Sequence, residues 1–134
     1  MKLISRNTDY AIRALCYMAA REKDTLSVTE LVEALRIPRP FLRKILQALN
    51  KKGILKSRKG MDGGFSLARK SDKIYLVDLI EAFQGPLKLN ECLFKKKVCP
   101  DRNSCWLKSK IDSIERYVVS ELKPVSIKTI LKGS

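Results

Sequence analysis

The sequence predicts a mainly α-helical protein with one small β-hairpin. Three observations support this prediction: apolar residues recur at helical spacing, a glycine-rich run at 60–64 separates two short alternating stretches, and the last third has a single narrow apolar seam. The chain has 134 residues, 45% of them hydrophobic, so it can bury one core and carry a small appendage. We therefore expect one compact unit, too short for two independent catalytic domains.

The first predicted helix spans residues 9–21, with Asn7 or Thr8 available as its N-cap. Its apolar stripe, with spacing i, i+3, i+4 and i+7, consists of Ile12, Leu15, Cys16 and Ala19. Because Cys16 shares this stripe, we interpret it as a small buried hydrophobic residue and separate it from the other three cysteines.

A second, shorter helix begins after Ser27, which can form a capping box with Glu30, and runs to about Leu35. Two prolines then force a turn, since each pushes its predecessor out of the helical region. The next helix spans 40–51 and ends at Gly53. Its predicted buried residues are Phe41, Leu42, Ile45, Leu46 and Leu49.

The outer face of the helix at 40–51 is basic and polar. A short helix, a tight turn and a second helix with a cationic face form a helix-turn-helix, in which the second helix enters the DNA major groove. The DNA contacts that we predict in this region are Arg39, Arg43, Lys44 and Gln47.

A hairpin follows the helix-turn-helix, because residues 54–58 and 65–67 alternate as strands do and the glycine-rich run between them predicts a turn. This is the wing of a winged helix-turn-helix domain. We expect its strand ends and tip to bring together Lys56, Arg58, Lys59 and Arg69. A surface hairpin with solvated lysines is the alternative, but contact with DNA phosphates accounts better for this charge bias.

A long helix is predicted from about 104 to 122, after a short helix at 76–84 and an aperiodic stretch at 87–103. Its seam, in alternating steps of four and three, consists of Leu107, Ile111, Ile114, Val118 and Leu122. A single seam on a chain that already has a core usually meets its own copy, so we predict a dimerisation helix. Packing back on the winged domain is the alternative.

These elements divide the chain into three parts. Residues 1–85 form the winged DNA-binding domain, whose first helix also packs at the dimer, and 86–104 form a cysteine-bearing loop. Residues 105–134 contain the dimerisation helix and, beyond Pro124, a last short helix at 125–131.

The formal net charge of +14 predicts a polyanionic partner, either nucleic acid or an anionic membrane surface. No apolar run approaches the roughly 18 residues that a membrane span needs, so we expect double-stranded DNA and no membrane. Asp9 and Arg13 interrupt the pattern of a signal peptide, which favours the cytoplasm. Thiols stay reduced there, so the cysteines indicate metal binding or redox sensing.

Cys92, Cys99 and Cys105 are spaced C-x6-C-x5-C in a chain without histidine. Thiolates are the soft ligands that iron–sulfur clusters, zinc and cuprous copper prefer. A zinc knuckle, a redox-thiol switch or a small iron–sulfur carrier are alternatives, although the close cysteine pair of most zinc sites is absent. Without histidine, a serine elbow or a convergent carboxylate pair, we expect no enzyme.

Several segments carry a resemblance to a known family: MKLISRNTDYAIRAL, RIPRPFLRKILQALNKKGIL, RKGMDGGFSL, VDLIEAFQGPL, and the three cysteines before the long helix. Over nearly its full length the chain resembles the bacterial iron–sulfur winged-helix regulators that include IscR and NsrR. The opening TDYAIRAL looks closer to the NsrR branch.

The resemblance implies a homodimeric repressor of promoter DNA whose three cysteines hold a 2Fe–2S or 4Fe–4S cluster. The implied signal is nitric oxide, oxygen or redox state, or cluster supply, and the opening motif favours nitric oxide. IscR-like members have a histidine ligand three residues after the last cysteine, where this chain has Lys108. Some NsrR-like members use an acidic residue near the start of the first helix, so Asp9 is the implied fourth ligand.

Overall fold

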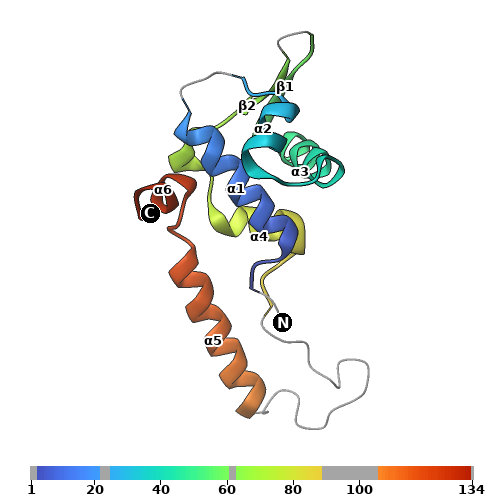
Figure 1. The fold of residues 1–134 in the computed structure, drawn as a ribbon. Helices are drawn as coiled ribbons and strands as arrows, with labels where there is room; N and C mark the ends of the chain where they lie inside the picture. The colour runs from blue at the N-terminus through green and yellow to red at the C-terminus, as the bar shows by residue number, and fades with distance from the viewer. Residues whose placement is uncertain (1–2, 22–24, 61–62, 89–105, 134) are drawn as a thin grey trace.

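The computed structural model of the protein describes residues 3–21, 25–60, 63–88 and 106–133. Its elements, shown in Figure 1, are α1 (Arg6–Ala20), α2 (Val28–Leu35), α3 (Arg39–Lys51), β1 (Leu55–Arg58), β2 (Gly64–Leu67), the 3-10 turn η1 (Ser71–Lys73), α4 (Leu76–Gln84), α5 (Trp106–Leu122) and α6 (Ile127–Gly133). The two strands form one antiparallel hairpin. The predicted fold class, mainly helical with a winged helix-turn-helix, is confirmed.

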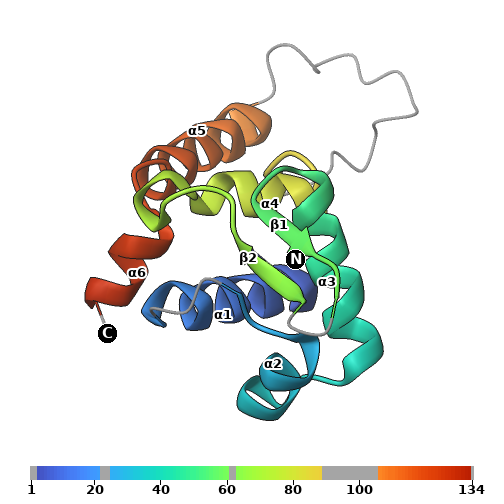
Figure 2. The same cartoon turned by 90° about the horizontal axis from the view of Figure 1, so that it is seen from above.

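Helix α1 lies at the centre of the core. It packs against α3, α4 and α6 and also contacts α2 and β2, and Figure 2 shows these elements arranged around it. The large side chains that are fully buried come from both ends of the chain: Thr8, Leu15, Leu31, Ile37, Leu42, Leu46, Leu49, Leu55, Ile74, Leu79, Ile80 and Ile127. The first and last helices therefore share one hydrophobic core.

Helix α1 begins three residues earlier than the sequence predicted. Ser5 is its N-cap, with an extended backbone and a hydroxyl that accepts the Thr8 amide at 3.2 Å. The buried face is also shifted, and consists of Thr8, Ala11, Ala14, Leu15 and Met18. Cys16 lies on the flank of this face, where it packs against the core but is only half-buried, so it is less buried than predicted. Its partial burial still raises the pKa of the Cys16 thiol, because desolvation disfavours the thiolate.

Helix α2 has the predicted N-terminal cap. The Ser27 hydroxyl accepts the Glu30 amide at 3.1 Å and donates to the Glu30 carboxylate at 3.4 Å, which confirms Ser27 as the cap of α2. The residue after α2, Arg36, is its C-cap and lies in the left-handed region with φ of 56°. The Arg13 guanidinium donates to the Leu35 carbonyl at 3.1 Å. These contacts satisfy backbone groups at both ends of a helix of only eight residues.

Helix α3 buries four of the five predicted residues, namely Leu42, Ile45, Leu46 and Leu49. The prediction for Phe41 was wrong, because this side chain is 48% exposed. Phe41 lies in the first turn, about 100° around the helix from Leu42, where the neighbouring elements no longer cover it.

The hairpin pairs Leu55 with Leu67 at its base and Arg58 with Gly64 near its tip. Leu26 also bridges to Phe65, so the segment before α2 runs along β2. Only glycine fits at position 64, because a Cβ there would collide with the Leu26 carbonyl. The close approach fixes the base of the hairpin against the helical core.

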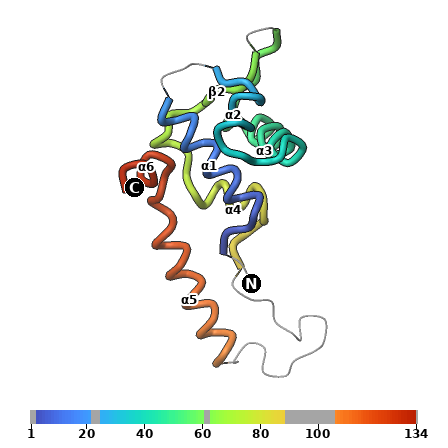
Figure 3. Tube along the Cα trace, viewed as in Figure 1, coloured from blue at the N-terminus to red at the C-terminus, as the bar shows by residue number. Residues whose placement is uncertain are grey.

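Helix α5 projects from the rest of the molecule, and its C-terminal end adjoins α6, which packs against the core, as the tube in Figure 3 shows. None of the 17 residues of α5 is buried, although the helix contacts α4. Backbone bonds then attach the start of α6 to the core: the Leu76 amide donates to Val125 and the Ile127 amide to Ile74, both at 2.9 Å. Within the described ranges, no helix combines the length and apolar character that a membrane crossing requires.

Candidate nucleic-acid interface

The outer face of α3 presents the predicted polar and cationic residues to solvent. Arg39, Arg43, Lys44 and Gln47 are all exposed, opposite the leucine and isoleucine side chains that attach the helix to the core. The Arg39 guanidinium donates to the Thr29 hydroxyl at 3.1 Å, which links the start of α3 to α2. The packing thus leaves one polar and cationic face of α3 available to a ligand.

The hairpin adds three more cations. Lys56, Arg58 and Lys59 are exposed, and because Lys56 and Arg58 are two residues apart on β1 they lie on the same face of the strand. Buried Leu55 lies on the opposite face. Since β1 packs against α3, the cations of the hairpin and those of α3 belong to neighbouring elements (Figure 1).

Arg69 does not join this group, so the expectation that it would gather with Lys59 was wrong. The register ends the paired strands at Leu55 and Leu67, which places Arg69 beyond the base of the hairpin and Lys59 beyond the opposite end. The Arg69 guanidinium instead donates to the Lys52 carbonyl at 3.5 Å.

Arg21 is a cation beside the hairpin that the sequence analysis missed. A hollow of about 580 Å³ lies between the end of α1 and the hairpin, and Arg21, Lys56 and Arg58 all line it. The Arg21 guanidinium stacks over the Tyr17 ring, 4.2 Å from its centroid. In the sequence, an arginine at the end of a helix is ordinary, and only the fold places Arg21, the C-cap of α1, beside the hairpin.

A second polar cluster joins the start of α1 to the end of α4. The Gln84 carboxamide oxygen accepts the Ser5 amide at 2.9 Å and the Thr8 hydroxyl at 2.7 Å, and its nitrogen donates to the Leu3 carbonyl at 3.2 Å. Thr8 is fully buried, so this bond satisfies a polar group inside the core. No sequence signal indicated this cluster, because a glutamine at a helix end is ordinary.

The three predicted cysteine ligands, Cys92, Cys99 and Cys105, lie outside the described residues. Asp9 is described: it is exposed in the first turn of α1, one turn from the Ser5 cap, and its amide donates to the Ser5 carbonyl. Within the part of the chain that the structure covers, no three histidine, cysteine or acidic side chains converge on a possible metal position.

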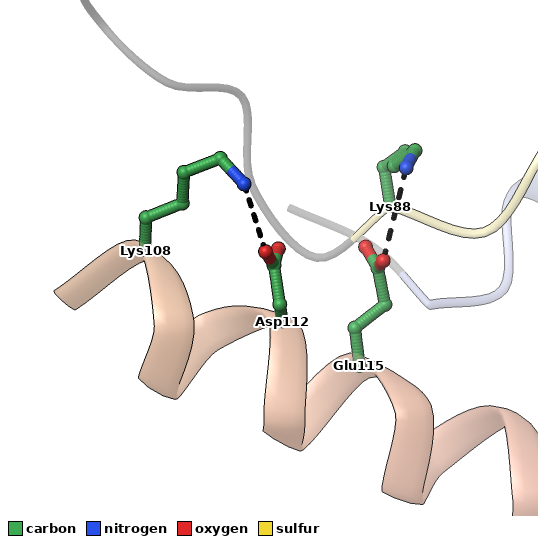
Figure 4. A network of polar contacts seen from close by, with 4 residues as sticks. All are labelled: Lys88, Lys108, Asp112 and Glu115. Carbon is green, nitrogen blue, oxygen red and sulfur yellow. Dashed lines mark hydrogen bonds and ion pairs between the residues drawn. The ribbon is translucent and has the colours of Figure 1, made fainter. Parts of the chain in front are cut away.

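Two ion pairs involve acidic residues of α5 (Figure 4). The Lys88 ammonium is 3.8 Å from the Glu115 carboxylate, and the Lys108 ammonium is 2.9 Å from the Asp112 carboxylate. The hydrogen bond from Lys108 is the main cause that lowers the pKa of Asp112 below its ordinary value. Lys108 is thus the ion-pair and hydrogen-bond partner of Asp112, one turn further along α5.

Residues 4–133 match the Rrf2 family, described as an iron-dependent transcriptional regulator. A protein of Aquifex aeolicus named as an HTH-type transcriptional regulator is 34% identical over 131 residues, or 96% of this chain and 91% of that protein. The HTH-type transcriptional regulator NsrR of Shouchella clausii is 30% identical over 125 residues, or 86% and 84% of the two chains.

The fold is also similar to a solved structure. CymR, the global cysteine regulator of B. subtilis, superposes with a TM-score of 0.78 at 21% identity, covering 100% of this chain and 99% of that chain. At this level of identity the likeness shows a shared fold.

Proposed function

This chain belongs to the Rrf2 family of DNA-binding transcriptional regulators, and from that premise we propose that it is a homodimeric repressor and that an iron–sulfur cluster controls its binding to promoter DNA. As a transcriptional regulator it is not an enzyme. The proposal combines three parts: a DNA-binding surface on α3 and the hairpin, a dimer contact on α5, and a cluster site in the cysteine segment.

The observation that carries the proposal is the adjacency of α3 and the hairpin with their cations exposed. A helix presenting side chains to base edges, next to a hairpin presenting lysine and arginine to phosphates, is the arrangement by which winged helices hold a duplex. We assign base contacts to Arg39, Arg43, Lys44 and Gln47, and backbone contacts to Lys56, Arg58 and Lys59.

The dimer contact is proposed for the seam of α5. Leu107 is 61% exposed and Ile114 is 42% exposed, while Ile111, Val118 and Leu122 are only partly covered within one chain. A repeating apolar seam left in water is stabilised by burial against a second copy. A dimer would also present two recognition helices to successive major grooves, as palindromic sites require.

The donor chemistry of the cysteine segment fits an iron–sulfur cluster. We propose Cys92, Cys99 and Cys105 as thiolate ligands, and Asp9 as the fourth ligand by its place at the start of α1. When bound, the cluster supplies a redox-sensitive and nitric-oxide-sensitive centre. Carboxylate is a hard ligand that binds such iron weakly beside three thiolates, so Asp9 is the ligand that a signal would displace first.

The experiment that tests the proposal begins with protein purified without oxygen. Broad absorbance near 400 nm with matching iron and sulfide is expected, and each of Cys92→Ser, Cys99→Ser and Cys105→Ser should abolish or severely destabilise it. Cys16→Ser is the matched control, because Cys16 is a half-buried cysteine of helix α1 that does not belong to the proposed ligand set. If the protein were colourless and contained zinc, the cysteines would form a structural zinc site and the cluster assignment would be wrong.

The fourth ligand has its own variant. Asp9→Ala should still assemble a cluster on three cysteines, with an altered spectrum and with DNA binding no longer coupled to cluster state. An unchanged spectrum and unchanged coupling would return Asp9 to the role of an acidic residue that complements the dipole of α1.

The DNA surface is tested on the same preparation by binding to promoter fragments over a range of salt. Arg43→Ala should relax base discrimination at a cost of about 1–3 kcal/mol. Lys59→Ala should weaken all sequences alike and flatten the slope of log affinity against log salt by about 0.9. If both Arg43→Ala and Lys59→Ala bound DNA as the wild type does, the assignment of α3 and the hairpin as the DNA-binding surface would be wrong.

A further inference from the structure

Phe41 is a large apolar side chain of the helix-turn-helix that the core leaves uncovered. It is 48% exposed in the first turn of α3, whereas the next residue, Leu42, is fully buried. The other large apolar side chains exposed to a similar degree in the described ranges lie near the N-terminus and on α5: Leu3, Trp106, Leu107, Ile114 and Tyr117. Phe41 is therefore separate from the apolar seam proposed for the dimer.

The surroundings of Phe41 restrict the kind of partner that it can meet. Arg39, Arg43 and Lys44, all exposed, are close to it in sequence on the same helix. A second copy of this surface would bring like charges together, which opposes self-association. Helix α5 lies on another side of the molecule, beyond α4 (Figures 1 and 2). Charge complementarity therefore favours a polyanion as the partner of this surface.

Duplex DNA offers an apolar contact to such a side chain. The first turn of a recognition helix is the part that meets base edges in the major groove. Among the base edges there, thymine carries a 5-methyl group, and apolar side chains including phenylalanine recognise it by contact. A phenyl ring can neither donate nor accept the hydrogen bonds that identify the other bases, so apolar contact is its available means of discrimination.

We infer that Phe41 is a specificity-determining residue that recognises the 5-methyl group of a thymine in each half-site of the operator. This inference rests on the proposed function, since it requires α3 to enter the major groove. The neighbouring cations of α3 contact polar base edges, while Phe41 selects for thymine at one position. Contact with the methyl group would also remove the exposed part of the ring from water.

The test compares thymine with deoxyuridine, which lacks the 5-methyl group and keeps the same base-pairing atoms. Duplexes are first selected from a random library by binding to the full-length wild-type protein. Each thymine is then replaced singly by deoxyuridine, and affinities are measured by fluorescence anisotropy. At one position in each half-site the wild type should lose about fourfold in affinity, the equivalent of burying one methyl-sized group.

Variants assign the effect to the side chain. Phe41→Ala should bind the thymine duplex more weakly and lose no further affinity on the deoxyuridine duplex, while Phe41→Leu, which remains apolar, should keep part of the ratio. Lys44→Ala is the matched control on the same helix: it should weaken both duplexes and preserve the fourfold ratio. Thermal melts of each variant check that the half-exposed position tolerates the change.

The outcomes separate this inference from the proposed function. A wild-type protein that binds selected duplexes with equal affinity for thymine and deoxyuridine at every position overturns the role of Phe41 and leaves DNA binding intact. A Phe41→Ala variant that keeps the wild-type ratio does the same. A wild-type protein for which no duplex can be selected overturns the proposed function, and the inference with it.

Discussion

Helices α1 and α5 have similar lengths and similar apolar repeats, but their surroundings differ completely. Five of the 15 residues of α1 are buried, and helices α3, α4 and α6 pack around it. None of the 17 residues of α5 is buried, and two side chains of its seam are exposed, Leu107 at 61% and Ile114 at 42%. An apolar repeat therefore indicates that a helix has a partner, without indicating whether that partner belongs to the same chain.

The largest expected effect contrasts one leucine from each helix. Leu15→Ala removes a fully buried side chain from the core and should lower the free energy of unfolding by about 2–5 kcal/mol. Leu107→Ala, at a position that is 61% exposed, should leave the stability of the isolated chain nearly unchanged. Denaturant unfolding at several protein concentrations distinguishes a core contribution from a dimer contribution, because a dimer contact contributes to stability only where the dimer is populated. Equal losses at all concentrations would place the α5 seam inside the subunit.

The next effect concerns the seam itself. Ile111→Glu or Val118→Glu places a charge in the proposed apolar contact, and the resulting penalty of about 3 kcal/mol or more should raise the dimer dissociation constant by roughly a hundredfold. Sedimentation should then show monomers, with loss of promoter binding. Lys110→Glu, at an exposed position of the same helix outside the seam, changes the charge by two units and is a stricter control for charge: it should leave the dimer intact. A dimeric Ile111→Glu protein with intact promoter affinity would contradict the dimer assignment.

A smaller effect is expected where α1 meets α4. Gln84→Ala removes the bonds to Ser5, Thr8 and Leu3, and leaves the buried Thr8 hydroxyl with the Ser5 hydroxyl at 3.0 Å. We expect a loss of about 1–3 kcal/mol in unfolding free energy. Gln84→Glu keeps the two accepted bonds and loses the donor to Leu3, so its cost should be lower. Thermal or denaturant melts measure both, and a harmless Gln84→Ala would show that apolar packing alone joins the two helices.

The smallest effect concerns the polar face of α5. The hydrogen bond from Lys108 keeps the pKa of Asp112 below its ordinary value, so its stabilising contribution is present at neutral pH and disappears as pH falls below 3.8 through the folded value. Lys108→Ala should raise the pKa of Asp112 toward 3.8, measured by NMR titration of its carboxyl group. Lys110→Ala should not change it. If Lys108→Ala also left it unchanged, another cation would have to account for the shift.

The sequence by itself determined most local structure, because its signals are short-range. Ser27 and Glu30 marked the start of α2, the glycine run at 60–64 marked the hairpin turn, and the seam of α5 marked a long helix, and all three appear where expected. The cations of α3 and the wing were also identified from the sequence, because an amphipathic pattern separates outer residues from inner ones. The cysteine trio and Asp9 stay predictions.

The tertiary structure decided how far the residues at the border of each apolar stripe are buried, and which distant residues meet. Helical periodicity assigned Phe41 to the buried stripe of α3 and Cys16 to that of α1. Neighbouring elements cover only the centre of each stripe, so Phe41 is 48% exposed and Cys16 is half-buried. Strand register placed Arg69 away from Lys59, and the packing of α4 on α1 brought Gln84 to Ser5, 79 residues away in sequence. Such contacts depend on how whole elements pack, and no short segment contains that information.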